Sequence, residues 1–264
     1  RHRETVPDLW RSYDRVRPTI ESIAADREHG AASLSVRALE VLRDEATLAA
    51  DEAREGTADL GATARALVEA RPAMPVVANR VNRVMAAAGD GGPQAVEHAA
   101  AAGIDHALTA DRRAARAAAD RLTEKRVATL SRSGTVLAAL RAGDPAAVLV
   151  AESHPGGEGG GVAETLADDC EVTLTTDAGF GHALAEWNAE LLLVGADAVL
   201  ADGRVVNKVG TRPAAVSASY EGISVVVVAA TDKVTPETAP TLEERGPDEV
   251  YDGDADLSVR NATF

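Results

Sequence analysis

The sequence of 264 residues contains one cysteine, Cys170, together with seven aromatic residues and three lysines. A single thiol cannot form an internal disulfide, so the sequence favours a reducing compartment. Its apolar runs are far shorter than the roughly 18 residues that a membrane-spanning helix needs. The start of the sequence has no apolar stretch typical of a signal peptide. We therefore predict a cytoplasmic protein without a membrane partner.

Acidic residues outnumber basic residues by 42 to 27, which gives a formal net charge of −15. This excess argues against direct binding to nucleic acid or to an anionic membrane as the main activity. Nearly all of the basic residues are arginine, alanine is abundant and aromatics are scarce. We interpret this composition as halophilic, suited to a high-salt cytosol in which carboxylates hold water. An acidic surface for a protein partner is the alternative interpretation.

The first 120 residues are rich in Ala, Arg, Glu and Leu, with apolar positions three to four apart, and this spacing predicts helices. Residues 31–50 have a broad apolar face formed by Leu34, Leu39, Val41, Leu42 and Leu48. Pro72 and Pro75 predict that one helix ends and another begins near Ala73. The GDGGP run at 89–93 predicts a second break, and Gly103 predicts an interruption of the long helical stretch over 95–122.

From Arg126 onward, short apolar runs alternate with helical or glycine-rich segments. Runs of this kind, without strict alternation, are typical of parallel strands that are covered on both faces. The expected strands are residues 127–130, 147–151, 171–175, 191–200 and 223–229. The predicted fold class is therefore α/β, with a helical N-terminal domain over 1–120 followed by a Rossmann-like parallel-sheet domain over 121–264.

Motifs for common cofactors and metals are missing. The glycine run 156–161 lies between an expected strand and a helical segment, so its amides could approach an anion, or it could be a plain flexible turn. It does not match the dinucleotide fingerprint, because the third glycine position is Val162. Neither GxxxxGK[ST] nor GxSxG occurs. The six histidines are scattered, so we predict no metal and no cofactor.

The most informative segment is residues 194–220. Asp197 follows an expected strand, at the edge where open α/β sheets carry their sites. Asn207 and Lys208 supply an amide and a cation, and Gly210 and Thr211 could begin a helix with its amides toward an anion. Taken singly, Asp197 could be a turn cap and Lys208 a solvated charge. Taken together, they form a pattern that is much more specific than any one of these residues.

The segment 195–211, GADAVLADGRVVNKVGT, resembles the signature of a superfamily with two kinds of member. One kind is the alpha, beta and delta regulatory subunits of translation initiation factor 2B. The other is the sugar-phosphate isomerases that act on methylthioribose 1-phosphate and ribose 1,5-bisphosphate. Further segments resemble family elements in the same order along the chain: Glu28–Ala32, Arg71–Ala73, Thr129–Ser133, Glu152–Pro155, Thr176–Ala178 and Val259–Asn261.

This resemblance implies a pocket for a sugar phosphate or nucleoside monophosphate between the two domains, and dimerisation through the second domain. In the isomerases a cysteine thiol and an aspartate move protons while an aldose 1-phosphate becomes a ketose. The aspartate matches Asp197 and the cysteine matches Ser131, so these are the candidate catalytic residues. The candidate ligand-binding residues are His29, Gly30, Ala31, Arg71, Ser133, His154, Asn207 and Lys208.

The sequence departs from the family pattern at three of these positions. A thiol with an ordinary pKa near ~8.5 can be tuned toward neutrality, whereas the Ser131 hydroxyl is a much weaker acid. Loss of one acid/base partner typically costs roughly 10²- to 10⁴-fold in rate. His29 and His154 stand where the family has phosphate-binding arginines, so a bidentate fork is replaced by a single imidazole.

Two functions follow as hypotheses. The first is a regulatory protein resembling the initiation factor 2B subunits. It would bind a phosphorylated small molecule, assemble into a homodimer or higher homo-oligomer, and have translation initiation factor 2 as a possible partner. The second is an aldose–ketose isomerase, an intramolecular oxidoreductase, that uses Asp197 as base with Ser131 or a bound water as proton carrier. An unrelated α/β binding protein is the third reading.

Overall fold

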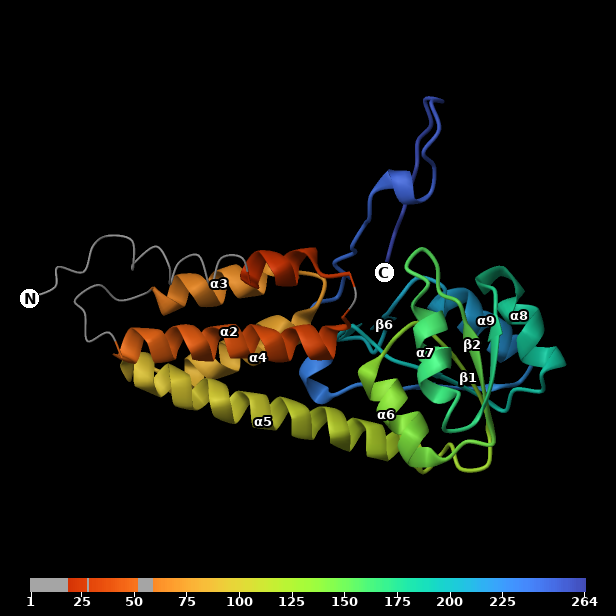
Figure 1. The fold of residues 1–264 in the computed structure, drawn as a ribbon, viewed down its shortest axis with the longest axis horizontal. Helices are drawn as coiled ribbons and strands as arrows, with labels where there is room; N and C mark the ends of the chain where they lie inside the picture. The colour runs from red at the N-terminus through yellow and green to blue at the C-terminus, as the bar shows by residue number, and fades with distance from the viewer. Residues whose placement is uncertain (1–18, 28, 52–58) are drawn as a thin grey trace, which may run out of the picture. The chain divides into compact units, whose positions relative to one another are not determined.

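The computed structural model describes residues 19–27, 29–51 and 59–264 of the chain. It divides into a helical unit that ends at Ala110 and an α/β unit from Asp111 to Phe264 (Figure 1). The division falls within the long helix α5 (Gly92–Ala119). The predicted domain boundary near residue 120 falls at the end of this same helix.

The helical unit holds a short helix at residues 19–25, then α2 (Ala31–Asp51), α3 (Leu60–Ala70), α4 (Pro75–Ala88) and the first part of α5. The predicted helix over 31–50 is confirmed, and its leucines at 34, 39 and 42 are fully buried. The predicted break near Ala73 is confirmed as well, because α4 begins with Pro75, which needs no amide partner there. None of the described helices is both long and apolar enough to cross a membrane.

The predicted interruption at Gly103 is wrong, because α5 runs through it without a break. A β-carbon on Gly103 would lie only 2.8 Å from Val84 Cγ2 and 3.3 Å from Leu39 Cδ1. The absence of a side chain therefore allows α5 to approach α2 and α4 closely. At this position the glycine serves helix packing and does not end a helix.

Arg80 on α4 is the bulkiest of the fully buried side chains, with 2% of its surface exposed. Its guanidinium donates to Ser35 Oγ on α2 at 2.8 Å and to the Ala107 carbonyl oxygen on α5 at 3.4 Å. A buried cation is tolerated only when its donors are satisfied. Arg80 thus joins three helices through polar contacts in the interior of the bundle.

The α/β unit contains a five-stranded sheet with the order β3-β2-β1-β4-β7, and each adjacent pair is parallel. The strands are β1 (Arg126–Leu130), β2 (Ala147–Ala151), β3 (Glu171–Thr175), β4 (Leu191–Val194) and β7 (Ser224–Val227). The connecting helices are α6 (Gly134–Gly143), α7 (Glu158–Leu166), α8 (Asp177–Glu186) and α9 (Thr211–Tyr220). The predicted α/β fold class, with helices preceding a Rossmann-like parallel sheet, is confirmed.

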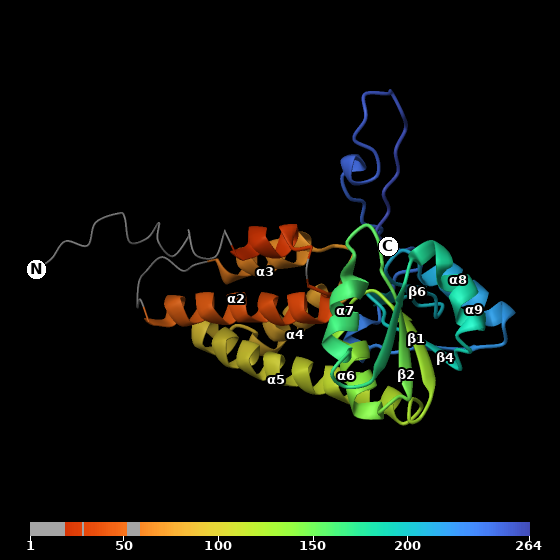
Figure 2. The same cartoon turned by 45° about the vertical axis from the view of Figure 1, so that its right-hand side comes forward.

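Apolar cores lie on both faces of this sheet. One face packs against α6, α7 and the end of α5, and the other packs against α8 and α9 (Figure 2). Alternate residues of one strand enter different cores: Val148 and Val150 of β2 face one, and Leu149 and Ala151 face the other. Coverage on both faces explains why the strands read as continuous apolar runs.

Two predicted elements differ from the structure. The expected strand over 191–200 stops at Val194, and residues 198–199 instead form β5 (Ala198–Val199), which pairs in antiparallel fashion with β6 (Val205–Val206). The glycine run 156–161 is not a simple turn, since α7 begins at Glu158 inside it. Local packing near the strand ends therefore overrides the helix-breaking tendency of glycine.

The final segment of the chain returns to the α/β unit. Short 3₁₀ turns occur at η1 (Thr231–Lys233) and η2 (Pro247–Glu249). An antiparallel bridge joins Glu244, which precedes η2, to Ala262, and the Val209 amide donates to the Thr263 carbonyl oxygen at 2.7 Å. The segment from residue 236 to the end, here called the C-terminal arm, is thereby attached at its base beside β6.

We expect Gly103→Val to destabilise the protein by about 1–3 kcal/mol, because the added atoms must displace buried side chains of α2 and α4. The free energy of unfolding from urea titration measures this. Gly161→Val is the matched control in helix α7, where a β-carbon meets no heavy atom within 4 Å. Equal effects of the two substitutions would contradict the packing role of Gly103.

Candidate functional site

The sheet changes direction between β1 and β4. From β1 the chain moves outward to β2 and then β3, whereas from β4 it moves outward on the other side to β7. In open α/β sheets this reversal separates the loops that follow the two central strands and leaves a crevice at their carboxyl ends, where ligands bind. Ser131 follows β1 directly, and Asp197 follows β4 after two residues. The two candidate catalytic residues thus lie on either side of the reversal.

The backbone is strained at the ends of β1 and β2. Ser131 has a φ angle of 59° and Ser153 one of 65°, both in the left-handed region that disfavours residues with a side chain. The Ser131 amide donates to Ser153 Oγ at 2.6 Å, and Ser153 Oγ donates to the Ala151 carbonyl oxygen at 3.0 Å. Strain of this kind persists only where the surroundings impose it, and it is concentrated at functional sites.

Asp177, the first residue of α8, organises the loop after β2. Its carboxylate accepts from the Ser153 amide at 2.8 Å and from the His154 amide at 2.6 Å. The His154 side chain is 66% exposed, and its Nε2 lies 3.6 Å from Glu152 Oε2. The loop is therefore held through its backbone, while the candidate imidazole points into solvent.

The β5–β6 hairpin brings Asp197 beside Asn207 and Lys208. The Asp197 amide donates to the Val206 carbonyl oxygen at 2.8 Å, so residue 197 lies at the open end of the hairpin, next to residue 207. Asn207 Nδ2 donates to Thr211 Oγ1 at 2.9 Å, which ties the amide to the start of α9. Asp197 and Asn207 are ten positions apart in the sequence, and the pairing of β5 with β6 brings them next to each other.

Ser133 connects the loops that follow β1 and β4. Its hydroxyl accepts from the Val136 amide at 3.3 Å and so caps helix α6. A β-carbon on Gly195 would lie 2.8 Å from Ser133 Oγ, which means that the two loops are in contact at this point. A residue larger than glycine at position 195 would separate Ser131 from Asp197.

Lys208 is buried and ion-paired. Its Nζ lies 2.8 Å from Glu158 Oε1 at the start of α7, and the two side chains are 5% and 12% exposed. The Gly159 amide donates to the Glu152 carbonyl oxygen, so the start of α7 adjoins the end of β2. The described site segments of the α/β unit therefore contact one another in a closed series. The end of β1 contacts the end of β2, the end of β2 contacts the start of α7, and α7 contacts the hairpin, which leads back through the end of β4 to the end of β1.

Lys233 in η1 is a site residue that the sequence analysis missed. Its ammonium donates to the carbonyl oxygen of Ala196, the residue before Asp197, and its side chain is buried. The signal was present, since lysine occurs only three times and Lys233 follows an apolar strand in a TDKV segment. A lysine buried against the backbone next to Asp197 fixes the course of that loop.

The remaining candidates lie in the helical unit around Asp26. His29 Nδ1 lies 2.9 Å from Asp26 Oδ2, and Arg71 Nη1 donates to the Asp26 carbonyl oxygen at 2.7 Å. Gly30 and Ala31 lead into α2, which begins at Ala31. The structure thus brings His29 and Arg71 together, while Glu28 of the same motif lies outside the described residues.

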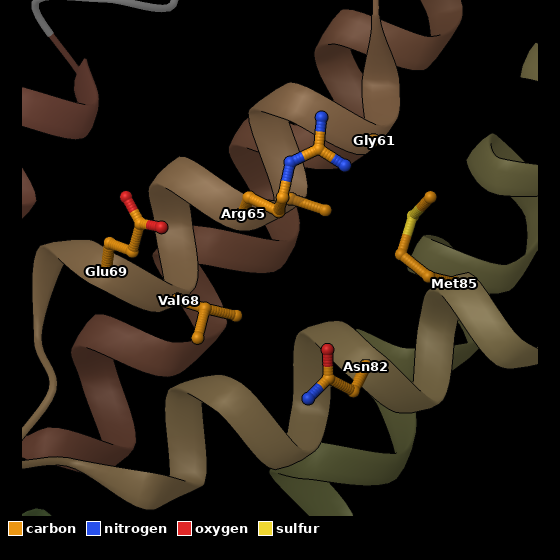
Figure 3. A pocket seen from close by; sticks show the side chains of 7 residues that line it. Gly61, Arg65, Val68, Glu69, Asn82 and Met85 are labelled. Atoms are coloured by element: carbon orange, nitrogen blue, oxygen red, sulfur yellow. The ribbon is translucent and has the colours of Figure 1, made fainter.

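Two features lie apart from these residues. A hollow between α3 and α4 is lined by Gly61, Ala64, Arg65, Val68, Glu69, Asn82 and Met85, none of which is a candidate (Figure 3). In the described part of the chain, no group of three or more His, Cys, Asp and Glu side chains could hold a metal ion.

Cys170 precedes β3 and therefore lies at the amino end of the strand, whereas Ser131 and Asp197 follow carboxyl ends. Burial, then the negative charges of Asp169 and Asp144, raise the pKa of the Cys170 thiol. A raised pKa opposes formation of the thiolate that a nucleophile or acid/base group needs. Cys170 thus cannot replace the thiol that is missing at position 131.

The sequence matches the Initiation factor 2 subunit family over residues 27–264. The chain belongs to this family. A ribose 1,5-bisphosphate isomerase from Haloferax volcanii is 34% identical over 95% of this chain and 84% of the relative. The crystal structure of translation initiation factor eIF-2B from Pyrococcus horikoshii OT3 is similar with a TM-score of 0.80, at 25% identity over 94% of this chain and 90% of that chain.

The crystal structure of the tetrameric eIF2B-beta2-delta2 complex from C. thermophilum is similar with a TM-score of 0.69, at 18% identity over 86% of this chain and 81% of that chain. This similarity establishes the shared fold. The resemblance inferred from the motifs is confirmed. Within the family, this chain carries Ser131 at the end of β1 and an ion-paired Lys208 after β6.

We expect the pH profile of Cys170 alkylation by iodoacetamide to have a higher midpoint in the folded protein than in the urea-unfolded chain. The folded chain holds the thiol proton to higher pH. The stability that the Cys170 thiol contributes is therefore fully present below the pKa of this thiol in the unfolded chain. It is lost as the pH rises through the pKa of the thiol in the folded chain. Asp144→Asn removes one of the raising charges and should lower the folded midpoint. Equal midpoints for folded and unfolded chains would contradict this environment.

Proposed function

We propose that the protein binds a phosphorylated pentose at the carboxyl edge between β1 and β4 and interconverts its aldose and ketose forms. The observation that carries this proposal is the placement of Ser131 and Asp197 on either side of the sheet reversal, with Ser131 in a strained conformation. The similarity to a ribose 1,5-bisphosphate isomerase along most of both chains supports the substrate class. Ribose 1,5-bisphosphate is therefore the first compound to test.

The proposed chemistry needs two groups that exchange protons with the sugar. The Asp197 carboxylate takes a proton from one carbon and returns one to its neighbour, which is within the range of carboxylate acid/base catalysis. The Ser131 hydroxyl, or a water bound to it, carries the second proton. Ser133, Asn207 and Lys208 hold the ligand by hydrogen bonds and charge. His154 is proposed as a solvent-facing contact.

A second function is favoured by one specific observation, the hydroxyl at position 131. A serine hydroxyl without an adjacent base is a poor acid near neutral pH, so binding without turnover would suit this site equally well. In this reading the protein is a regulatory member, as the initiation factor 2B subunits are. It would respond to a phosphorylated ligand, and translation initiation factor 2 would be the partner to examine.

Ser131→Cys should raise the rate of conversion of ribose 1,5-bisphosphate to ribulose 1,5-bisphosphate by roughly 10²-fold or more, because a thiol is a much better proton donor. Asp197→Asn should abolish turnover in both backgrounds while ligand binding is retained. ³¹P NMR in molar salt follows both sugar phosphates directly, and isothermal titration calorimetry measures binding.

Binding without turnover in both the wild type and Ser131→Cys would end the isomerase proposal and favour the regulatory one. Failure of the wild type and of Ser131→Cys to bind any phosphorylated pentose or nucleoside monophosphate would end both.

We further propose that the protein forms a homodimer through the β7 side of the α/β unit. Among the described strands, β7 forms one edge of the sheet. Next to it, Val216 and Tyr220 of α9 are 63% and 87% exposed. Val227 of β7 is 41% exposed on the same face of the sheet as α9, since Val226 packs into the opposite core. Exposed apolar side chains grouped in this way are typical of interfaces.

Replacing both Val216 and Tyr220 with Asp should convert a dimer to a monomer, because two charges would have to be buried at the interface. Sedimentation velocity measures the mass in solution. Leu174→Asp is the control, since Leu174 is a 51% exposed residue on β3 at the opposite edge. A wild-type monomer, or a double variant that remains dimeric, would contradict the proposed interface.

A further inference from the structure

A buried cluster of charged side chains lies where α7, the β5–β6 hairpin and the C-terminal arm meet. Glu158 Oε1 lies 2.8 Å from Lys208 Nζ and 3.9 Å from Arg245 Nη2. Arg245 comes from the C-terminal arm, its side chain is 9% exposed, and its Nη1 lies 3.5 Å from Glu249 Oε2. One carboxylate of α7 thus faces two cations from distant parts of the chain.

The cluster leaves polar atoms unused. Within the described residues, Glu158 Oε2 and Arg245 Nε are buried without a hydrogen-bond partner. A buried acceptor or donor without a partner is costly, and ion pairs that serve only stability are normally satisfied throughout. A sugar hydroxyl can donate to a carboxylate oxygen such as Glu158 Oε2 and can accept from an N–H such as that of Arg245 Nε, so hydroxyls of a ligand have the chemistry that these atoms need.

The cluster is also balanced in charge. Lys208 and Arg245 face Glu158 and Glu249, so these four side chains carry no net charge when all are ionised. A phosphate dianion that approached Lys208 would meet the Glu158 carboxylate next to it. In a poorly hydrated site, repulsion between these like charges opposes binding strongly.

We propose that Glu158 is a specificity-determining residue that keeps a phosphate dianion away from Lys208 and admits a hydroxyl-bearing part of the ligand instead. This inference rests on the proposed function, because it concerns the ligand of the same site. Lys208 is then a partner of the sugar hydroxyls, and the phosphoryl groups are bound by other residues.

Glu158→Gln tests this role, because glutamine keeps the shape and the acceptor for Lys208 while removing the negative charge. The variant should bind inorganic phosphate and ribose 1,5-bisphosphate about ten-fold more tightly or better than the wild type, measured by calorimetry at constant ionic strength. Affinity for unphosphorylated ribose should not rise. Glu164→Gln is the matched control on the exposed face of the same helix, with the same change in total charge, and should leave all three affinities unchanged.

Glu158→Asp separates charge from shape, since it retains the carboxylate on a shorter side chain. It should bind phosphate no more tightly than the wild type. If Glu158→Gln is less stable, its midpoint of thermal unfolding should rise with added phosphate more than that of the wild type, because the anion takes the place of the lost carboxylate.

Unchanged or weaker phosphate binding by Glu158→Gln, with no extra stabilisation by phosphate, would overturn the inference. Measurements on the wild-type protein test the proposed function separately from the role of Glu158. Wild-type protein that binds and converts ribose 1,5-bisphosphate keeps the proposed function whatever the variants at position 158 do. Tight phosphate binding that appears only in Glu158→Gln keeps the role of Glu158 while the proposed substrate fails.

Discussion

The hydrogen bond from the Ser131 amide to Ser153 Oγ holds together the part of the molecule on which the site depends. It joins the first residue after β1 to the second residue after the neighbouring parallel strand β2, and both of these residues have left-handed backbone conformations. Neither conformation is favourable for serine in isolation. Each is sustained by the other and by Asp177, which accepts from the amides of Ser153 and His154. The loops after β1 and β2 are consequently fixed before any ligand arrives, as preorganised binding requires.

Around this bond, elements from distant parts of the sequence become neighbours for separate physical reasons. The parallel sheet aligns the carboxyl ends of β1 and β4, the small hairpin returns the chain from Asp197 to Asn207, and an ion pair attaches Lys208 to α7. Lys233 supports the same loop through the Ala196 carbonyl oxygen. Backbone pairing therefore sets the positions of the site residues, and the buried charged side chains set the electrostatic character of the site.

The fold could be predicted largely from the sequence, because apolar runs of strand length and helical periodicity are local signals. The predicted and observed bounds of β2 and β3 coincide. Two of the exceptions, Gly103 and the glycine run in which α7 begins, are positions where a tertiary contact determines the role of a glycine. Asp197 was found because it follows an expected strand, and Ser131, Ser133 and His154 were found because their segments resemble family motifs. Glu158, Lys233 and Arg245 were missed because their importance comes from long-range pairing that no local pattern records.

The β5–β6 hairpin has a consequence for how this site can vary. Two paired rungs, Ala198 with Val206 and Val199 with Val205, fix its base, and Ala198, Leu200 and Val206 bury that base against Phe264. The turn beyond the rungs is exposed at residues 201–204. Insertions or deletions at this tip would leave the spacing between the carboxylate at 197 and the amide at 207 untouched. The paired base of the hairpin therefore fixes the distance between these two side chains, whereas the sequence of the exposed turn can vary. Related proteins could acquire new surface contacts at the turn without disturbing the chemistry at the base.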